Sequence, residues 1–225
     1  MTTNDNLSAH NAIDYDIEIL RTIPYYNLFH EETLSLITTI KPQVKVWLDT
    51  GSGTGNLVEK AMNKFPDCKF YLSDPSKSML MICKDKFRGK PVELLGEYET
   101  VQIENKIQPE IITAIQCHHY LDFKSRIATT NHCFDLLSEG GIYITFENIK
   151  PESIEGTEIG LRRWSEYQQK QGKSEGDIKI HLSRFDTHFY PIKVSEHIDI
   201  MKNAGFKTVE LFWMSNMQAG FYGIK

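Results

Sequence analysis

The chain has 225 residues, of which 40% are hydrophobic and 24% are charged, and its formal net charge is −5. These values are typical of one globular domain and exclude a disordered or fibrous protein. The negative charge argues against general binding to nucleic acid, which needs a basic surface. No apolar run has the length of a membrane span, and residues 1–10 lack the features of a secretion signal, so we expect a cytoplasmic protein without a membrane partner.

The predicted elements begin with a polar segment over residues 1–12, which we expect to be mobile. Helical spacing of apolar residues then predicts two short helices over 12–40, interrupted at Pro24. From there to residue 146, short apolar runs alternate with helical stretches, and strands are predicted at 44–48, 70–72, 92–95, 111–115 and 142–146. Because parallel neighbours need a crossover, this alternation indicates a mainly parallel sheet.

Residues 150–191 break this rhythm and are interpreted as a helical insertion over the sheet edge. A last helix ending near Gly205 precedes two strands at 208–213 and 219–224. The expected fold is therefore α/β: a Rossmann-like, seven-stranded, mainly parallel sheet with helices on both faces and a small helical lid. We expect one domain over 1–225, made of an N-terminal helical cap (1–42), a cofactor-binding core (43–149), the lid (150–191), and the last helix with its hairpin (192–225).

A glycine-rich turn, Asp49-Thr50-Gly51-Ser52-Gly53-Thr54-Gly55, follows the first strand. Ligands of open α/β sheets bind at the carboxyl ends of the strands, and glycines there allow close approach to the backbone. A nicotinamide fingerprint would need a third glycine where Asn56 stands, and a Walker loop would need Gly-Lys-Ser/Thr at its end. Both phosphate-binding interpretations are therefore weakened.

The stretch from Leu48 to Gly55 resembles the first motif of class I S-adenosylmethionine-dependent methyltransferases, in their small-molecule branch. Three further stretches agree with this family, namely Ser73-Asp74-Pro75-Ser76-Lys77-Ser78-Met79-Leu80, Leu137-Ser138-Glu139-Gly140-Gly141, which has Glu139 in place of the family's proline, and Ala204-Gly205-Phe206. The resemblance extends over residues 12–225. It implies S-adenosyl-L-methionine as cofactor, a small-molecule methyl acceptor as partner, and SN2 transfer of the methyl group.

The resemblance implies that Asp74 binds the ribose hydroxyls and that Met79 packs near adenine. Two acids flanking a turn without a lysine also suit a cofactor with an amino-acid head and a sulfonium, although loop capping alone remains an alternative for each acid. The family often has an adenine-binding Asp after the third strand; here the sequence is Leu95-Gly96-Glu97-Tyr98, so this role falls to Glu97 or is missing. The expected cofactor-binding residues are Asp49, Thr50, Gly51, Ser52, Gly53, Gly55, Asp74, Pro75, Met79, Glu97, Gln116, Tyr15 and Arg21.

A histidine pair, His118-His119, follows the fourth strand, whose end faces the methyl group in this family. Three interpretations stay open: packing against the cofactor, contact with the substrate as a general base, or metal binding. Metal binding is the weakest, because adjacent histidines do not readily face one ion, and we predict no metal site. The candidate catalytic residues are His118, His119 and Tyr25.

The two helical segments at 12–40 and 150–191 are the natural lids in this family. Tyr15, Arg21 and Tyr25 are the favoured contacts from the first segment, where aromatic rings would exclude water and attract the sulfonium. An arginine of these two segments could receive a substrate carboxylate; the candidates are Arg21, Arg162, Arg163 and Arg184. For each of these residues, a solvated or packing role is the alternative.

Three other functions remain open. The chain could be a cofactor-binding interaction protein without activity, or a nicotinamide oxidoreductase. It could also use a carboxylated form of the cofactor, because Ile23-Pro24-Tyr25 resembles an element of a related tRNA-modifying group. The acceptor and the oligomeric state are not predicted, and a homodimer is left open.

Overall fold

The computed structural model describes residues 5–225. Over this range the chain forms one seven-stranded sheet of order β3-β2-β1-β4-β5-β7-β6. The strands are β1 (Val46–Thr50), β2 (Lys69–Ser73), β3 (Val92–Gly96), β4 (Ile111–Ile115), β5 (Ile142–Asn148), β6 (Thr208–Ser215) and β7 (Gln218–Ile224). The first five pair in parallel, and β7 pairs antiparallel with both β5 and β6. The predicted Rossmann-like fold is therefore confirmed.

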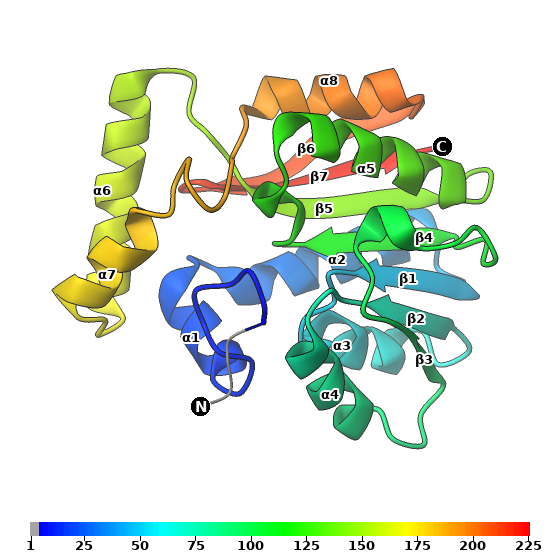
Figure 1. The fold of residues 1–225 in the computed structure, drawn as a ribbon. Coiled ribbons are helices and arrows are strands. Elements are labelled where there is room, and N and C mark those ends of the chain that lie inside the picture. Colours follow the sequence, from blue (N-terminus) through cyan, green and yellow to red (C-terminus); the bar gives the residue numbers. More distant parts are fainter. Residues whose placement is uncertain (1–4) are drawn as a thin grey trace.

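The helices connect the strands and cover both faces of the sheet (Figure 1). They are α1 (Tyr15–Thr22), α2 (Tyr26–Ile40), α3 (Asn56–Lys64), α4 (Lys77–Lys86), α5 (Phe123–Leu136), α6 (Ile154–Lys170), α7 (Glu175–Leu182) and α8 (Val194–Ala204), with short 3-10 turns η1 (Thr100–Gln102) and η2 (His118–Tyr120). No helix within residues 5–225 is long and apolar enough to cross a lipid bilayer.

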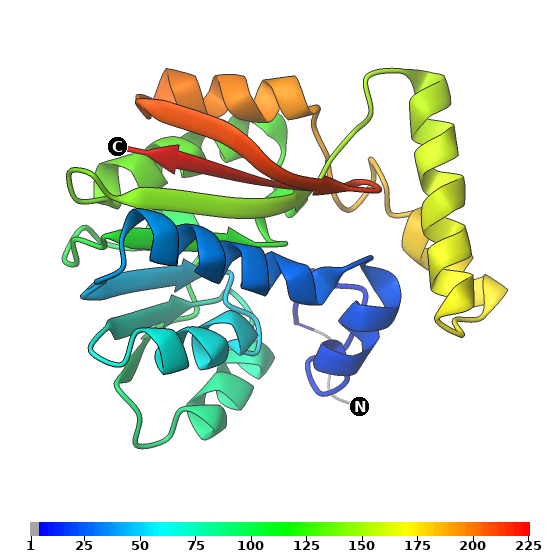
Figure 2. The ribbon, with the colours of Figure 1, turned by 180° about the vertical axis from the view of Figure 1, so that it is seen from behind.

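Two apolar cores hold these layers together, one on each face of the sheet. On one face, Phe29 of α2 stacks on Phe146 of β5, with ring centroids 4.6 Å apart. On the other face, Leu136 of α5 and Met201 of α8 are buried with the sheet residue Ile112. Figure 2 shows α2 lying along the sheet, and Figure 1 shows α5 and α8 on the opposite side.

Helices α6 and α7 stand beside the carboxyl ends of the parallel strands, away from the sheet (Figures 1 and 2). Buried Trp164 of α6 donates its Nε1–H to the Thr22 carbonyl oxygen at 2.7 Å, and Tyr167 donates to the Leu20 carbonyl oxygen at 2.8 Å. These bonds join the inserted helices to α1. The insertion predicted over 150–191 is thus present as two helices packed on the N-terminal ones.

The segment over residues 5–10, which we call the strap, was predicted to be mobile but makes specific contacts. Asp5 accepts hydrogen bonds from the Ser76 hydroxyl at 2.8 Å and from the Ser78 backbone N–H at 3.1 Å. The His10 ring is buried, and its Nε2 lies 2.9 Å from the Thr22 hydroxyl. Residues 5–10 are therefore held by specific contacts in this structure, and the prediction for residues 1–4 lies outside the described residues.

Candidate active site

A cavity of about 270 Å³, which we call the main cavity, opens at the carboxyl ends of the parallel strands. Gly51 and Gly53 line it after β1, Asp74 lines it after β2, and Gln116 lines it after β4. The strap covers it, because Asp5, Asn6, Leu7 and Ser8 also belong to its lining. This is the position at which open α/β sheets bind small molecules, and the volume is near the lower end for such sites, about 300 Å³.

Asp74 is fixed in the wall of this cavity by two backbone donors. Its Oδ2 accepts the Gly53 N–H and its Oδ1 accepts the Ser76 N–H, both at 2.8 Å. Burial raises the pKa of Asp74, while these two hydrogen bonds oppose the shift. Each carboxylate oxygen keeps a second acceptor site, so the side chain can accept two more hydrogen bonds from a diol.

The glycine turn brings backbone against the cavity where no side chain would fit. Gly51 has φ +60°, and a Cβ there would lie 2.4 Å from the Cβ of Cys117. Gly53 also has a positive φ, of +54°. Glycine is therefore required at the first position for both conformation and space, and a ligand can approach the main chain closely.

A smaller cavity of about 20 Å³, which we call the loop cavity, lies beside the glycine turn and is lined by Asp49, Ser52, Tyr15, Tyr26 and His30. Asp49 Oδ1 accepts the Thr113 hydroxyl at 2.5 Å. Burial raises the pKa of Asp49 to about 7; the Thr113 hydrogen bond opposes this and the charge of Asp74 adds to it. The Nδ1 of His30 is buried and has no hydrogen-bond partner within residues 5–225.

The chain after β3 turns so that Glu99, Thr100 and Val101 line the main cavity, whereas Glu97 is exposed and outside the lining. Gly96 has φ +135°, and the Ser73 hydroxyl donates to the Tyr98 carbonyl oxygen at 2.8 Å. This turn moves the cavity edge two residues beyond the predicted position. The prediction that Glu97 contacts the ligand is thus not supported by its place in the structure.

His118 and His119 are both buried, and a carboxylate from β5 holds them in place. Glu147 accepts the His119 backbone N–H at 2.7 Å and lies 2.9 Å from the His119 Nδ1. It also accepts the His118 backbone N–H at 3.3 Å and the Thr145 hydroxyl at 2.5 Å. Burial acts to raise the pKa of Glu147, but the bond from His119 and the neighbouring positive groups outweigh it and lower the pKa to about 2.

The ring of His118 is bonded at both nitrogens. Its Nε2 lies 3.0 Å from the Thr100 hydroxyl and its Nδ1 lies 2.9 Å from the Tyr143 hydroxyl. Burial lowers the pKa of His118 to about 4, so the ring is neutral at pH 7. His118 lines the main cavity, but neither ring nitrogen is left to take a proton from a substrate. These bonds favour the structural interpretation of His118, and its role as a general base stays a prediction.

Cys117, His118 and Glu147 place ligand atoms within 4.8 Å of one another, which is close enough for a shared metal ion. Each of these atoms already has a partner, however. The Cys117 thiol donates to the Thr50 carbonyl oxygen, and the other two residues make the bonds just described. The cluster is thus explained by its own hydrogen bonds.

Comparison with known proteins points to one family. Residues 48–143 match the family model described as a methyltransferase domain. This match and the relatives given below support a class I S-adenosylmethionine-dependent methyltransferase. This match covers the glycine turn, Asp74 and the histidine pair, and most residues that line the main cavity lie within it; the strap and Tyr15 lie outside.

Curated relatives of this methyltransferase share low identity over nearly their whole length. A carboxy-S-adenosyl-L-methionine synthase of Campylobacter lari is 24% identical over 202 residues, covering 90% of this chain and 86% of the relative. One from Staphylococcus epidermidis is 19% identical over 219 residues, covering 97% of this chain and 95% of the relative.

Solved structures of other methyltransferases share the fold. Human N-acetylserotonin methyltransferase matches with a TM-score of 0.66 at 14% identity, over 97% of this chain and 56% of that one. Magnesium protoporphyrin IX methyltransferase of Synechocystis matches with a TM-score of 0.62 at 14% identity, over 89% of this chain and 83% of that one. The chain spans little more than half the length of several structures that it matches.

The structure brings together about half of the predicted site residues. Those that line the main cavity are Tyr15, Gly51, Gly53, Asp74, Pro75, Met79, Gln116 and His118. Asp49 and Ser52 line the loop cavity. Thr50 and Gly55 shape the turn: the Thr50 hydroxyl bonds that of Thr100 at 2.7 Å, and Gly55 has φ +79° with the Phe87 ring against it.

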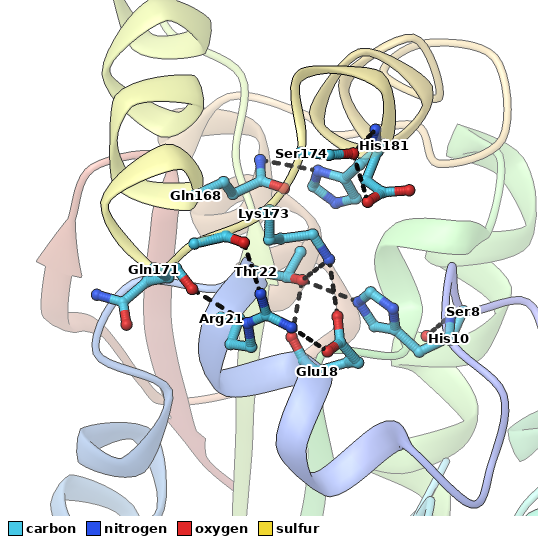
Figure 3. A network of polar contacts seen from close by, with 12 residues as sticks. Ser8, His10, Glu18, Arg21, Thr22, Gln168, Gln171, Lys173, Ser174 and His181 are labelled. Atoms are coloured by element: carbon cyan, nitrogen blue, oxygen red, sulfur yellow. Dashed lines mark hydrogen bonds and ion pairs between the residues drawn. The ribbon is translucent and has the colours of Figure 1, made fainter.

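Two residues predicted from the first helical segment lie elsewhere. Tyr25 is 57% exposed at the start of α2 and lines none of the cavities described above, so its predicted catalytic role is not supported. Arg21 donates to the carbonyl oxygens of Gln171 and Gly172 and pairs with Glu18 at 2.7 Å (Figure 3). It joins α1 to the inserted helices and does not line the main cavity.

Other lining residues of the main cavity were missed. They are Asp5, Asn6, Leu7, Ser8, Ser76, Glu99, Thr100, Val101, Ile115, Cys117, Tyr120, Leu121 and Thr129. The second acid in Glu97-Tyr98-Glu99 was a usable signal, because either glutamate could have followed the strand. The strap carries no such signal, since its residues have neither periodicity nor a motif.

Proposed function

We propose that the main cavity binds S-adenosyl-L-methionine and that the enzyme transfers the methyl group to a small-molecule acceptor. The observation that carries this proposal is Asp74, a buried carboxylate in the cavity wall with both oxygens held by backbone donors and an acceptor site left on each. This arrangement suits the two hydroxyls of a ribose. Met79 and Val101, which line the same cavity, supply apolar surface for a base.

The loop cavity fits the amino-acid end of this cofactor. Asp49 offers a buried carboxylate for an ammonium group, and the unpartnered Nδ1 of His30 lies in the same wall. Tyr15 lines both this cavity and the main one, so its ring stands between the two ends of the cofactor. The residues present therefore fit the group.

When bound, the cofactor supplies an electrophilic methyl group on a sulfonium. The chain's own contribution is orientation and exclusion of water. The strap and Tyr15 close the cavity, and the Glu147 bonds hold the turn after β4 in place. Because the His118 ring is fully bonded, we propose no protein base, and SN2 transfer to an acceptor that is already nucleophilic needs none.

Binding of the cofactor is expected to release a proton near Asp49. Since burial holds the pKa of Asp49 at about 7, the carboxyl is partly protonated in the free protein at pH 6.5. A nearby ammonium favours the ionised form and lowers this pKa, so affinity should rise with pH up to about 7 and then level off. Calorimetry with S-adenosylhomocysteine in two buffers of different ionisation enthalpy measures the release, and Asp49→Asn should abolish it.

A second function is favoured by the curated relatives, which are named carboxy-S-adenosyl-L-methionine synthases. It would use the same cofactor site: the sulfonium methyl carbon would lose a proton and form a carbon–carbon bond to carbon dioxide that a second substrate releases. The Ile23-Pro24-Tyr25 element stands between α1 and α2, where Tyr25 has φ +59°.

Product analysis separates these functions. The protein is incubated with S-adenosylmethionine and a metabolite extract, and products are identified by mass spectrometry. Formation of S-adenosylhomocysteine with a methylated small molecule is the expected result. A carboxylated sulfonium compound would instead establish the second function, and tight cofactor binding without any product would point to an inactive binding protein.

A further inference from the structure

A second small cavity, of about 20 Å³, adjoins the main cavity on the side of the inserted helices. We call it the arginine cavity, because Arg184, which follows α7, lines it. It shares Ser8, Tyr15, Gln116 and Tyr120 with the main cavity, so these residues lie between the two spaces. Ser8, Ala9 and His10 of the strap close its other side.

Arg184 is a cation without a carboxylate partner. None of the ion pairs within residues 5–225 includes it. Its guanidinium instead donates to the carbonyl oxygen of Leu7 in the strap. By contrast, Lys173 and Arg21 nearby are both paired with Glu18, at 3.0 and 2.7 Å (Figure 3). Of these three cations, Arg184 alone has no carboxylate partner within residues 5–225.

The histidines around the arginine cavity add no charge of their own. Burial lowers the pKa of His181 to about 3 and that of His10 to about 4, and the positive charge of Arg184 adds to both shifts. Burial also lowers the pKa of His119, although Glu147 opposes this. All three rings are thus neutral at pH 7, and the cavity keeps the uncompensated charge of one guanidinium.

Gln116 stands between the two cavities in a backbone conformation that few residues adopt. Its φ is +58°, and it follows directly on β4. The conformation is held by its backbone N–H and its Nε2, which donate to the Phe146 carbonyl oxygen at 2.7 and 3.3 Å. Such strain in a non-glycine residue is characteristic of functional sites. The position of Gln116 between the two cavities is therefore fixed by its own hydrogen bonds.

We infer that the arginine cavity is the site of the second substrate and that Arg184 binds its carboxylate. The inference rests on the proposed function, since it places the second substrate next to the cofactor. In this structure, the Arg184 guanidinium donates to the Leu7 carbonyl oxygen, and a substrate carboxylate would take the place of that oxygen. A cavity of about 20 Å³ holds little more than one water, so residues 8–10 of the strap move outward when the substrate enters.

The test compares carboxylates with their uncharged amides on protein loaded with S-adenosylhomocysteine. Phenylacetate and benzoate are titrated beside phenylacetamide and benzamide into the wild type, Arg184→Gln, Arg184→Lys and the control Arg163→Gln, which changes an exposed arginine of α6. We expect the carboxylates to bind the wild type and Arg163→Gln better than the amides. In Arg184→Gln this preference should fall about 10- to 100-fold, the range for a lost charge-assisted hydrogen bond, and Arg184→Lys should keep part of it.

The amides separate a charge role from a structural one, because a merely structural arginine would weaken both ligands equally. An equal loss, or carboxylates that bind no better than amides to the wild type, would overturn the inference while S-adenosylhomocysteine binding remains. Failure of S-adenosylhomocysteine to bind would instead defeat the proposed function. A final arm titrates carboxy-S-adenosylmethionine: if Arg184→Gln weakens it but leaves the free carboxylates unchanged, the arginine serves the cofactor and the inference is wrong.

Discussion

Asp74→Ala is expected to weaken binding of S-adenosylhomocysteine by at least about 2 kcal/mol, or roughly 30-fold in Kd. The substitution removes the acceptor that we assign to the ribose hydroxyls. It also leaves the backbone N–H groups of Gly53 and Ser76 without their partner, which loosens the glycine turn. Calorimetric titration measures the affinity, and thermal unfolding shows how much of the protein remains folded.

The matched control for this prediction is Asp85→Ala, an exposed acid on the helix that follows Asp74, paired with Arg88 on the surface. It should leave the affinity unchanged. Asp74→Asn should keep an acceptor for one of the two backbone donors and still lose most of the affinity. A Kd of Asp74→Ala equal to that of the wild type, in a folded protein, would remove Asp74 from the cofactor site.

Glu147→Gln is expected to lower the free energy of unfolding by about 3 kcal/mol, the upper range for leaving buried hydrogen-bond donors without their acceptor. The carboxylate accepts bonds from two backbone N–H groups, the Thr145 hydroxyl and the His119 ring. A glutamine presents N–H groups to some of these donors and leaves them unsatisfied. Urea unfolding at pH 7 measures the loss, and Glu158→Gln, an exposed change on α6, should have no effect.

The contribution of Glu147 to the free energy of unfolding is expected to fall at low pH. The pKa of Glu147 in the folded protein is about 2, below its value of about 4.3 in an unfolded chain. Its stabilisation is therefore fully present above pH 4.3 and is lost as the pH falls towards 2. The wild type should lose its stability advantage over Glu147→Gln in this window. An advantage that is unchanged at low pH would show that the carboxylate is not ionised in the folded protein.

The sequence predicted the fold well, because its signals are local. Pro24 separates the two N-terminal helices, and Gly205 ends the last helix with φ +110°. The alternation of short apolar runs with helices determines a parallel sheet through the need for crossovers. The glycine turn is equally local, since φ and space at Gly51 allow no other residue.

The predicted residues that line the main cavity lie mostly in turns that follow strands, with Tyr15 of α1 and Met79 of α4 as exceptions. Asp74 and Gln116 directly follow a strand, and both line the main cavity. The role of the histidine pair depends on Glu147, which is distant in sequence and belongs to β5. Arg21 and Tyr25 failed because the direction of each side chain is determined by the packing of the inserted helices and by the start of α2. The spacing of apolar residues in the sequence does not indicate the direction of either side chain.

A crystal structure of the protein grown with S-adenosylhomocysteine tests the central claim most directly. We predict that the ribose hydroxyls lie within hydrogen-bonding distance of Asp74, that the base lies beside Glu99, Thr100 and Val101, and that the amino group faces Asp49. A nucleoside bound outside the main cavity, or one whose ribose does not contact Asp74, would contradict this account of the site.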